Sequence, residues 1–600
     1  MSENTDKKVL LSLRNVDVKF NVRGRILSAI RNVSLDIYEN ESLAIVGESG
    51  SGKSVLTKTF AGLLDSNGFI SHGSIIFNDD EISKTTVKVT GRNEKMLQYI
   101  FNMLNKHSQL ERGADEYVAY MQKKKEINGE KSLSEEEEQS YQDKIKILSD
   151  DIVDKNNYLL TLDRKSAADA PEIEKALAKI KDFTEQKNAV IAERDALIKE
   201  RKANFNANSE KNAADAAILK ELEEERKKKI ATPDKESNPY GLSDEVIERN
   251  RIIAYEVLLS IGRYPFKDQV TFVYKLDKAF KLAMSIGEDL TDPEVLNKIF
   301  DVVTFRVEYR SYDEATKTLY GHAIIDCAKV KYTNDWQQIR GCRIATVFQD
   351  PMTSLNPVIT IGKQIMTVIL KHQKCSQAEA KKRTIEIMGK VGIPDPEKRF
   401  NDYPFEYSGG MRQRIVIAIA LSCQPKILIC DEPTTALDVT IQAQIIRLIK
   451  DLQHELGFTT VYITHDLGVV ANVAERVAVL YGGQIVEVGS VEEIFYDPRH
   501  PYTWALLSSL PQLGERGTNL FSIPGTPPSL YNKIIGDAFA PRNKYAMAID
   551  LVEEPPMFQV SETHFAKTWL LDPRAPKAEA PANIQNLHEK MLKTYVDFEV

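Results

Sequence analysis

The sequence predicts an α/β fold, because a short apolar strand, a glycine-rich loop and the start of a helix follow one another near the N-terminus. The strand is predicted over 42–46, and the loop after it reads Gly47-Glu48-Ser49-Gly50-Ser51-Gly52-Lys53-Ser54. Glycines let backbone N–H groups close around a phosphate, and a helix N-terminus adds unpaired donors. Lys53 is placed for the β- and γ-phosphates and Ser54 for Mg²⁺. The segment therefore predicts a nucleotide phosphate site.

Length and composition limit the class of protein. A chain of 600 residues exceeds one ordinary core, so several domains are expected. The net charge of −8 argues against a general nucleic-acid binder. The first eight residues lack a signal peptide's apolar core, and no apolar run reaches the ~18–20 residues that span a bilayer. We therefore expect any work at a membrane to be done through partners.

The five cysteines are scattered along the chain and include no C-x-x-C pair. Such a set suits reduced thiols in a cytosolic protein better than disulfides or a zinc site. The residues are Cys327, Cys342, Cys375, Cys423 and Cys430.

From residue 85 to 333 the chain becomes rich in Lys and Glu and poor in Gly. Two helices are predicted over 172–202 and 213–229. A heptad pattern precedes them, formed by Ile145, Leu148, Ile152, Leu159 and Leu162. This pattern predicts an inserted, mainly helical and partly coiled-coil domain, although a solvated charged linker is an alternative. The predicted domains are 1–84, 85–333, 334–500 and 501–600.

Two further segments carry residues suited to phosphate chemistry. An apolar strand over 427–432 ends in Asp431 and Glu432, the first suited to Mg²⁺ and the second to orienting or deprotonating a water. A buried strand with an exposed acidic end is the alternative. A second segment places a serine hydroxyl and free N–H groups at a helix start, where they can face an anion or serve as an ordinary cap. Its residues are Ser408, Gly409, Gly410 and Met411.

Taken together, these motifs resemble the ATP-binding subunit of ABC transporters. Their order is the phosphate loop, Gln349, the signature at 408–411, Asp431 with Glu432, Asp438 and His465. The resemblance covers about 9–84 and 336–530. It implies a RecA-like core, an antiparallel β subdomain and a helical signature subdomain. The inserted domain and a C-terminal extension lie outside the usual pattern.

Finer residues resemble the D-type ATPase of the oligopeptide and dipeptide permeases. They lie at 348–357, 408–414, 431–440 and 497–503. That family commonly carries four cysteines in its C-terminal extension, associated with an iron–sulfur cluster. The aligned positions here hold Asp537, Asn543, Asp550 and Thr568, so no iron–sulfur cluster is expected.

The resemblance implies that two ATPase subunits meet head to tail and sandwich two ATP molecules. The signature of this chain would act on the ATP of its partner, and Asp438 would couple the two sites. Glu432 would be the general base, His465 would contact the γ-phosphate, and Gln349 would sense Mg²⁺ and the attacking water. Phe20 aligns with an aromatic that stacks on adenine, but a core phenylalanine is the alternative.

The implied partners are a second, F-type ATPase subunit, two transmembrane permease subunits and an extracytoplasmic substrate-binding protein. No nucleic acid is expected, and the chain would be peripheral on the cytoplasmic face of the cell membrane. Within transporters, an importer of nickel or another small solute is an alternative. A more distant one is an SMC-like chromosome or DNA-repair ATPase, but those proteins place the coil after the glutamine loop.

Overall fold

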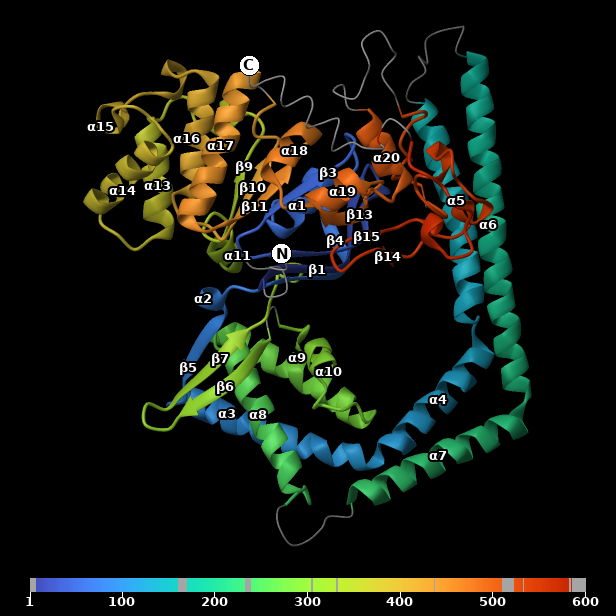
Figure 1. Cartoon of the computed structure of the whole chain (residues 1–600). Helices are drawn as coiled ribbons and strands as arrows, with labels where there is room; N and C mark the ends of the chain where they lie inside the picture. The colour runs from blue at the N-terminus through green and yellow to red at the C-terminus, as the bar shows by residue number, and fades with distance from the viewer. Residues whose placement is uncertain are drawn as a thin grey trace. The chain divides into compact units, whose positions relative to one another are not determined.

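The computed structural model describes residues 7–159, 170–231, 239–303, 306–330, 333–435, 437–509, 523–532, 534–581 and 584. The chain divides into two compact units (Figure 1). The first comprises 1–85, 304–308 and 321–600, and the second comprises 86–303 and 309–320. The four predicted domains, 1–84, 85–333, 334–500 and 501–600, remain our proposal for the domain boundaries.

The first unit is built on an eight-stranded sheet of order β14-β15-β13-β12-β3-β11-β10-β9. The five strands from β12 to β9 are parallel, so their carboxyl ends meet at one edge. These strands are β3 (Ser42–Val46), β9 (Ile344–Val347), β10 (Ile427–Asp431), β11 (Thr459–Ile463) and β12 (Arg476–Tyr481). The antiparallel strands are β13 (Gln484–Ser490), β14 (Phe558–Gln559) and β15 (Phe565–Ala566).

A second, antiparallel sheet of order β2-β1-β4-β8 belongs to the same unit. Its strands are β1 (Val9–Val22), β2 (Arg25–Tyr38), β4 (Gly68–Phe77) and β8 (Ile325–Asp326). The buried Asp326 carboxylate accepts the Ile75 N–H at 2.9 Å, which holds β8 to β4 although the two residues are 251 positions apart. The predicted combination of an α/β core with an antiparallel β part is confirmed.

Several of the longer helices of the first unit share one apolar core with the parallel sheet. The apolar residues 415–421 form the second half of α16, and Ile415 and Ile417 are fully buried. The helices are α1 (Lys53–Phe60), α2 (Asp80–Ser83), α11 (Thr333–Ile339), α12 (Pro351–Ser354), α13 (Ile361–His372), α14 (Gln377–Lys390), α15 (Pro396–Arg399), α16 (Gly409–Leu421), α17 (Val439–Leu456), α18 (Leu467–Val473), α19 (Val491–Tyr496) and α20 (Pro501–Ser508).

The second unit has its own apolar core, to which α3, α8, α9 and α10 contribute. Strands β5 (Lys84–Lys88), β7 (Thr318–Ala323) and β6 (Val307–Asp313) form a three-stranded sheet where the chain enters and leaves this unit. The helices are α3 (Arg92–Ser108), α4 (Ala114–Lys131), α5 (Glu135–Leu159), α6 (Ala170–Ala207), α7 (Ser209–Ala231), α8 (Asp244–Ile261), α9 (Phe266–Ser285) and α10 (Pro293–Phe300).

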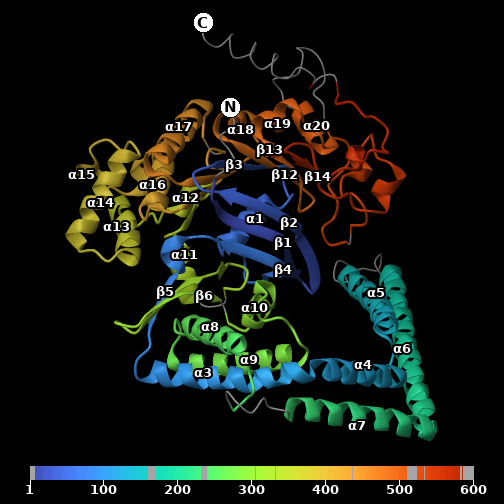
Figure 2. The same ribbon diagram turned by 60° about the horizontal axis from the view of Figure 1, so that its bottom comes forward.

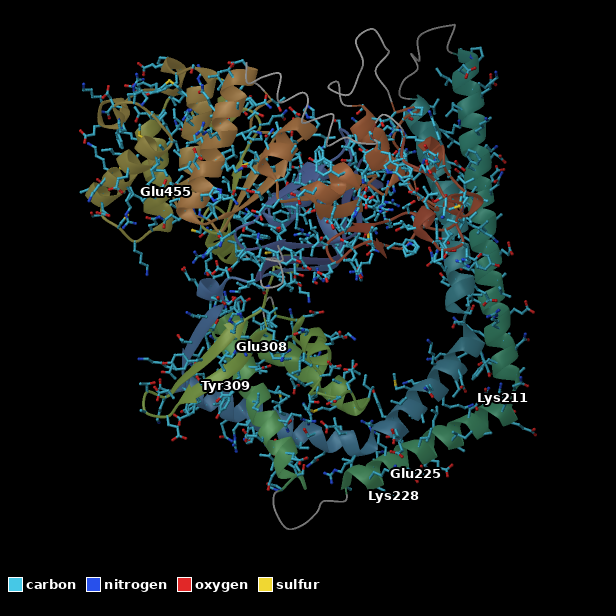
Figure 3. The ribbon with its side chains drawn as sticks, viewed as in Figure 1. Lys211, Glu225, Lys228, Glu308, Tyr309 and Glu455 are labelled. Atoms are coloured by element: carbon cyan, nitrogen blue, oxygen red, sulfur yellow. The ribbon has the colours of Figure 1, made fainter. Side chains whose placement is uncertain are left out.

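Long helices of the second unit lie side by side in antiparallel pairs (Figure 2). Helix α4 pairs with α7 through two ion pairs, one between Lys123 and Asp215 at 2.9 Å and one between Lys211 and Glu130 at 2.5 Å. Charged residues cover α7, among them Lys211, Glu225 and Lys228 (Figure 3).

Helix α5 pairs with α6 through an ion pair between Arg201 and Glu137 at 2.7 Å and a hydrogen bond from Tyr141 to Glu193 at 3.1 Å. The helices predicted over 172–202 and 213–229 are therefore present, as α6 and α7, and are slightly longer than predicted. Leu162 of the predicted heptad pattern lies outside the described residues.

Candidate active site

Four loops that follow parallel strands meet at the carboxyl edge of the eight-stranded sheet. The phosphate loop follows β3, Gln349 follows β9, Glu432 follows β10 and His465 follows β11. The strand ends are level, because Asp431 pairs with Ile463, which in turn pairs with Ile45. Ligands of open parallel sheets bind at this edge. The fold therefore brings together residues that are up to 418 positions apart in the sequence.

At two positions of the phosphate loop, only glycine fits the backbone conformation. Gly47 has φ +155°, and a Cβ there would lie 2.1 Å from the carbonyl oxygen of Leu480. Gly52 has φ +104°, and its Cβ would lie 2.9 Å from the carbonyl oxygen of Ala29. Both glycines are therefore required for the chain to turn tightly beneath a phosphate. Between them lie Glu48, Ser49, Gly50 and Ser51.

The Lys53 ammonium is held inside this loop. Its Nζ donates to the carbonyl oxygens of Gly47 at 2.7 Å and Glu48 at 3.0 Å. Burial lowers the pKa of Lys53, whereas the nearby Glu432 and Asp431 carboxylates act in the opposite direction. A phosphate placed in the loop would supply the counter-charge that this half-desolvated cation favours.

Ser54 and Asp431 lie together at the end of β10. The Ser54 hydroxyl donates to Asp431 Oδ1 at 3.1 Å. Burial raises the pKa of Asp431, and the hydrogen bond from Ser54 partly opposes that rise. A hydroxyl and a carboxylate are hard oxygen ligands of the kind that Mg²⁺ prefers. The residues present therefore fit a magnesium ion bound next to the phosphate loop.

Glu432 lies where three segments converge. Its backbone has φ +46°, and its N–H donates to the carbonyl oxygen of Ile463 at 2.9 Å. One carboxylate oxygen accepts Gln349 Nε2 at 2.9 Å, and the other lies 3.1 Å from His465 Nδ1. The Thr435 hydroxyl also donates to Glu432, at 3.0 Å. The structure thus brings together the three residues expected to act on a water molecule, Gln349, Glu432 and His465.

The signature residues begin helix α16. The exposed Ser408 is the N-cap, and its hydroxyl accepts the Met411 N–H at 3.4 Å. A Cβ on Gly410 would lie 2.6 Å from Ile441 Cγ2, whereas one on Gly409 would meet Leu437 at 3.4 Å. Within the described ranges, no hydrogen bond joins 408–411 to the phosphate loop at 47–54.

Two other predicted site residues occupy ordinary positions in the fold. Asp438 is the N-cap of α17 and accepts the Ile441 N–H at 3.0 Å. Phe20 lies on β1, half-buried, with its ring against Gly68, where a Cβ would come within 2.6 Å of the ring. Dimer coupling by Asp438 and adenine stacking by Phe20 therefore stay predictions.

The structure reveals a support for the phosphate loop that the sequence analysis missed. The Arg542 guanidinium holds both carboxylate oxygens of Glu48, at 2.7 and 3.0 Å, and also contacts the Tyr481 hydroxyl at 3.1 Å. The Tyr502 hydroxyl accepts the Glu48 N–H at 2.8 Å. We call Glu48, Tyr481, Tyr502 and Arg542 the loop clamp. The peptide-importer pattern at 497–503 includes Tyr502 and was the one signal that could have pointed to it.

The positions aligned with the cluster cysteines form local hydrogen bonds. Asp537 donates its N–H to the carbonyl oxygen of Asp550 at 2.7 Å, Asn543 accepts the Tyr545 N–H, and Thr568 accepts the Leu570 N–H. Among the described residues, no group of three or more His, Cys, Asp or Glu is arranged to hold a metal ion. That this chain binds no iron–sulfur cluster stays a prediction. All five cysteines are free thiols.

The fold and this site define a P-loop nucleotide-binding protein with an ABC-type signature helix. The ABC transporter family model matches residues 30–243 and 314–435. A model of the oligopeptide/dipeptide transporter C-terminal region matches 486–549. The chain belongs to the ABC transporter family, in the group of oligopeptide and dipeptide transport ATP-binding proteins. It is an ABC-type ATPase.

Several curated relatives are similar to this chain. The oligopeptide transport ATP-binding protein AmiE of Streptococcus pneumoniae serotype 4 is 66% identical over 314 residues, covering 51% of this chain and 85% of AmiE. The oligopeptide transport ATP-binding protein OppD of Bacillus subtilis is 60% identical over 262 residues, 44% of this chain and 73% of OppD. The dipeptide transport ATP-binding protein DppD of Lactococcus lactis subsp. cremoris is 54% identical over 312 residues, 52% of this chain and 87% of DppD. In the part of this chain that is described, no helix is long and apolar enough to cross a bilayer.

Proposed function

We propose that this chain is the ATP-hydrolysing subunit that powers import of oligopeptides or dipeptides through an ABC permease. The observation that carries the proposal is the C-terminal region at 486–549, which matches the oligopeptide/dipeptide transporter model. Relatives named for oligopeptide and dipeptide transport, up to 66% identical to this chain, support the same cargo. The SMC-like alternative provides no reason for such a C-terminal region.

In this proposal, two ATP sites form between this chain and a second ATPase subunit of F type. The exposed Ser408 at the start of α16 supports this arrangement, since free donors at a helix N-terminus can face the phosphates of a partner's nucleotide. The remaining partners are two transmembrane permease subunits and an extracytoplasmic substrate-binding protein. The chain would lie on the cytoplasmic face of the membrane and bind no nucleic acid.

The site residues have distinct roles in the proposed reaction. Backbone N–H groups of the phosphate loop and Lys53 hold the β- and γ-phosphates. Ser54, Asp431 and Gln349 would hold Mg²⁺, which neutralises phosphate charge when it is bound. Glu432 orients the attacking water and takes its proton, while the terminal P–O bond breaks and ADP leaves. His465, 3.1 Å from Glu432, would contact the γ-phosphate.

The proposed assembly is tested by isolating the chain from its native membranes in a mild detergent. Mass spectrometry of the co-purifying proteins should identify two multi-span permease subunits and a second ABC ATPase. Chromosomal proteins or DNA, without membrane subunits, would contradict the importer and favour the SMC-like alternative. A parallel titration with ATP should show weaker binding by Lys53→Ala than by the wild type, because the loop loses its cation.

A further inference from the structure

Two cysteines that are 81 positions apart in the sequence lie together at one surface pocket of the first unit. Cys342 lies in the loop before β9, and Cys423 lies just after the signature helix α16. Both side chains line this pocket, and the Cys423 thiol is near enough to influence the pKa of Cys342. The Cys342 sulfur also lies 3.0 Å from Nδ1 of His372, at the C-terminal end of α13. We call Cys342, His372 and Cys423 the thiol cluster.

Backbone hydrogen bonds fix the two cysteine loops against each other. The carbonyl oxygen of Arg343 accepts the N–H groups of Lys426 at 2.8 Å and Ile427 at 2.9 Å. The side-chain amide of Gln373 donates to the carbonyl oxygen of Ser422 at 3.2 Å, which ties the end of α13 to the same loop. The backbone therefore holds the two cysteine loops next to each other at this pocket.

The thiol cluster is accessible from solvent. It lines a pocket of about 580 Å³ together with Gln337, Gln338 and Lys371. All three members of the cluster are half-buried. By contrast, Cys327 and Cys430 are buried, and burial raises the pKa of both of these thiols. A small oxidant can therefore reach Cys342 and Cys423, whereas the two buried thiols are protected.

The surroundings favour the thiolate of Cys342. The interaction with the Cys423 thiol, followed by the charge of Arg343, lowers the pKa of Cys342, although burial acts in the opposite direction. Burial also lowers the pKa of His372, which keeps its ring neutral and able to accept a proton at pH 7. Low-pKa, accessible cysteines with a second cysteine in contact are the ones that oxidise reversibly.

We propose that Cys342 and Cys423 are a reversible redox pair that reacts with hydroperoxides, with His372 as the proton acceptor. The Cys342 thiol gives its proton to His372, and the sulfur attacks one oxygen of the hydroperoxide. The O–O bond breaks, Cys342 becomes a sulfenic acid, and the second oxygen leaves as an alcohol or water with the proton from His372. The Cys423 sulfur then attacks the Cys342 sulfur; an S–S bond forms, the S–O bond breaks, and water leaves with the Cys423 proton.

The disulfide would join two segments that lead to the active site. Cys342 is followed by β9 and Gln349, and Cys423 follows the helix that begins at Ser408. Oxidation would thus place a covalent link between the segment that carries Gln349 and the segment that carries the signature. A cellular thiol would restore both cysteines by thiol–disulfide exchange.

The test treats the purified full-length chain with hydrogen peroxide and identifies peptides by mass spectrometry without reduction. We expect a peptide pair linked through Cys342 and Cys423, which dithiothreitol separates. It should form on the order of ten times faster than Cys375 is modified, since Cys375 is half-buried as well but lies outside the cluster. Variant Cys423→Ser should instead accumulate a Cys342 sulfenic acid that dimedone traps.

Two matched variants separate the chemistry from a structural effect. His372→Gln should slow oxidation of Cys342 while ATP binding stays unchanged, and Cys375→Ser should form the disulfide at the wild-type rate. ATP titration of each variant shows that it is folded. The proposal is wrong if Cys342 and Cys423 react no faster than Cys375, or if the linked peptide is absent when both thiols are consumed.

Discussion

Glu432 is the residue at which the distant parts of the site meet. It contacts Gln349, 83 positions earlier, and His465, 33 positions later. A carboxylate held by an amide and an imidazole is oriented to accept a proton from a water molecule. These contacts hold the Glu432 side chain at the carboxyl edge of the sheet, level with Ser54 and Asp431.

Substitution Glu432→Gln should leave ATP binding intact and lower ATP hydrolysis by about 100-fold or more, because the amide cannot take the proton. Binding is measured by titration and hydrolysis by phosphate release. Glu455→Gln is the control, since Glu455 lies at the exposed end of α17 in an ion pair with Lys390 (Figure 3). Hydrolysis at the wild-type rate by the Glu432 variant would remove Glu432 from its proposed role.

Asp537 gives the stability of the protein a dependence on pH. Burial, followed by the nearby Asp550, raises the pKa of Asp537 from 3.8 to about 6. The Asp537 carboxyl therefore keeps its proton in the folded chain at pH values where the unfolded chain has already lost it. The contribution of this proton to the free energy of unfolding is lost as the pH rises through 6. Asp537→Asn should raise the free energy of unfolding by about 1–3 kcal/mol at pH 7.5 and much less at pH 4.5.

Urea unfolding of wild type and variant at both pH values measures this difference. The Asn oxygen can still accept the Phe539 N–H that Asp537 accepts at 3.0 Å. Asp497→Asn, at an exposed ion pair with Arg499, is the matched control for the loss of a carboxylate. An Asp537 variant that is less stable than the wild type at pH 7.5 would overturn the prediction.

At the scale of elements, the C-terminal region supports the phosphate loop. The η4 turn (Ala540–Arg542) supplies the clamp arginine, and α20 supplies Tyr502. The Arg542 side chain is 5% exposed and that of Glu48 is 24% exposed, so this is a largely buried, two-pronged ion pair. The C-terminal region that distinguishes the peptide-transporter group thus reaches the nucleotide site directly.

Arg542→Met should lower the free energy of unfolding by about 3 kcal/mol, because it leaves the Glu48 carboxylate without its partner. It should also weaken ATP binding, because the loop loses an anchor. The matched control is Arg574→Met, which removes an exposed arginine from a comparable contact with Asp572 and should have a much smaller effect. The double variant Arg542→Met with Glu48→Met should recover part of the lost stability. Additive effects of the two substitutions would show that the pair does not interact.

Elements set by local sequence were predictable, and contacts between distant elements were not. The strand at 42–46 was predicted with its observed bounds, and the strand predicted over 427–432 ends one residue earlier, at Asp431. Apolar runs next to a glycine loop or a carboxylate pair mark both strands clearly. The meeting of Gln349, Glu432 and His465 was expected only through the family resemblance. The Arg542–Glu48 pair spans 494 positions, and the thiol cluster joins two loops and the end of α13. Neither contact leaves a periodicity or a spacing in the sequence that could predict it.

At the scale of the whole molecule, the chain combines two units, each with its own apolar core. Val89 donates its N–H to the Lys317 carbonyl at 2.8 Å, and β5 and β7 are neighbours in the three-stranded sheet. Thr85 and Gly321 therefore lie on neighbouring strands. The chain therefore enters and leaves the second unit on neighbouring strands of one sheet, as a tolerated surface insertion would do.

Replacing residues 86–320 by a short Gly/Ser linker should leave ATP affinity within about twofold of the wild type, since the linker joins neighbouring strands of one sheet. The replacement keeps β8, which the first unit needs for its pairing with β4. Fluorescent-nucleotide titration measures the affinity. A variant that folds but binds ATP far more weakly would show that the second unit contributes to the nucleotide site.

The most direct test of the central claim is peptide uptake by the assembled transporter in proteoliposomes. We expect labelled oligopeptide to accumulate only when ATP is present on the side that carries this chain. Accumulation should stop with Glu432→Gln and continue with Glu455→Gln. ATP hydrolysis without peptide uptake, or uptake that the Glu432 variant leaves unchanged, would contradict the account.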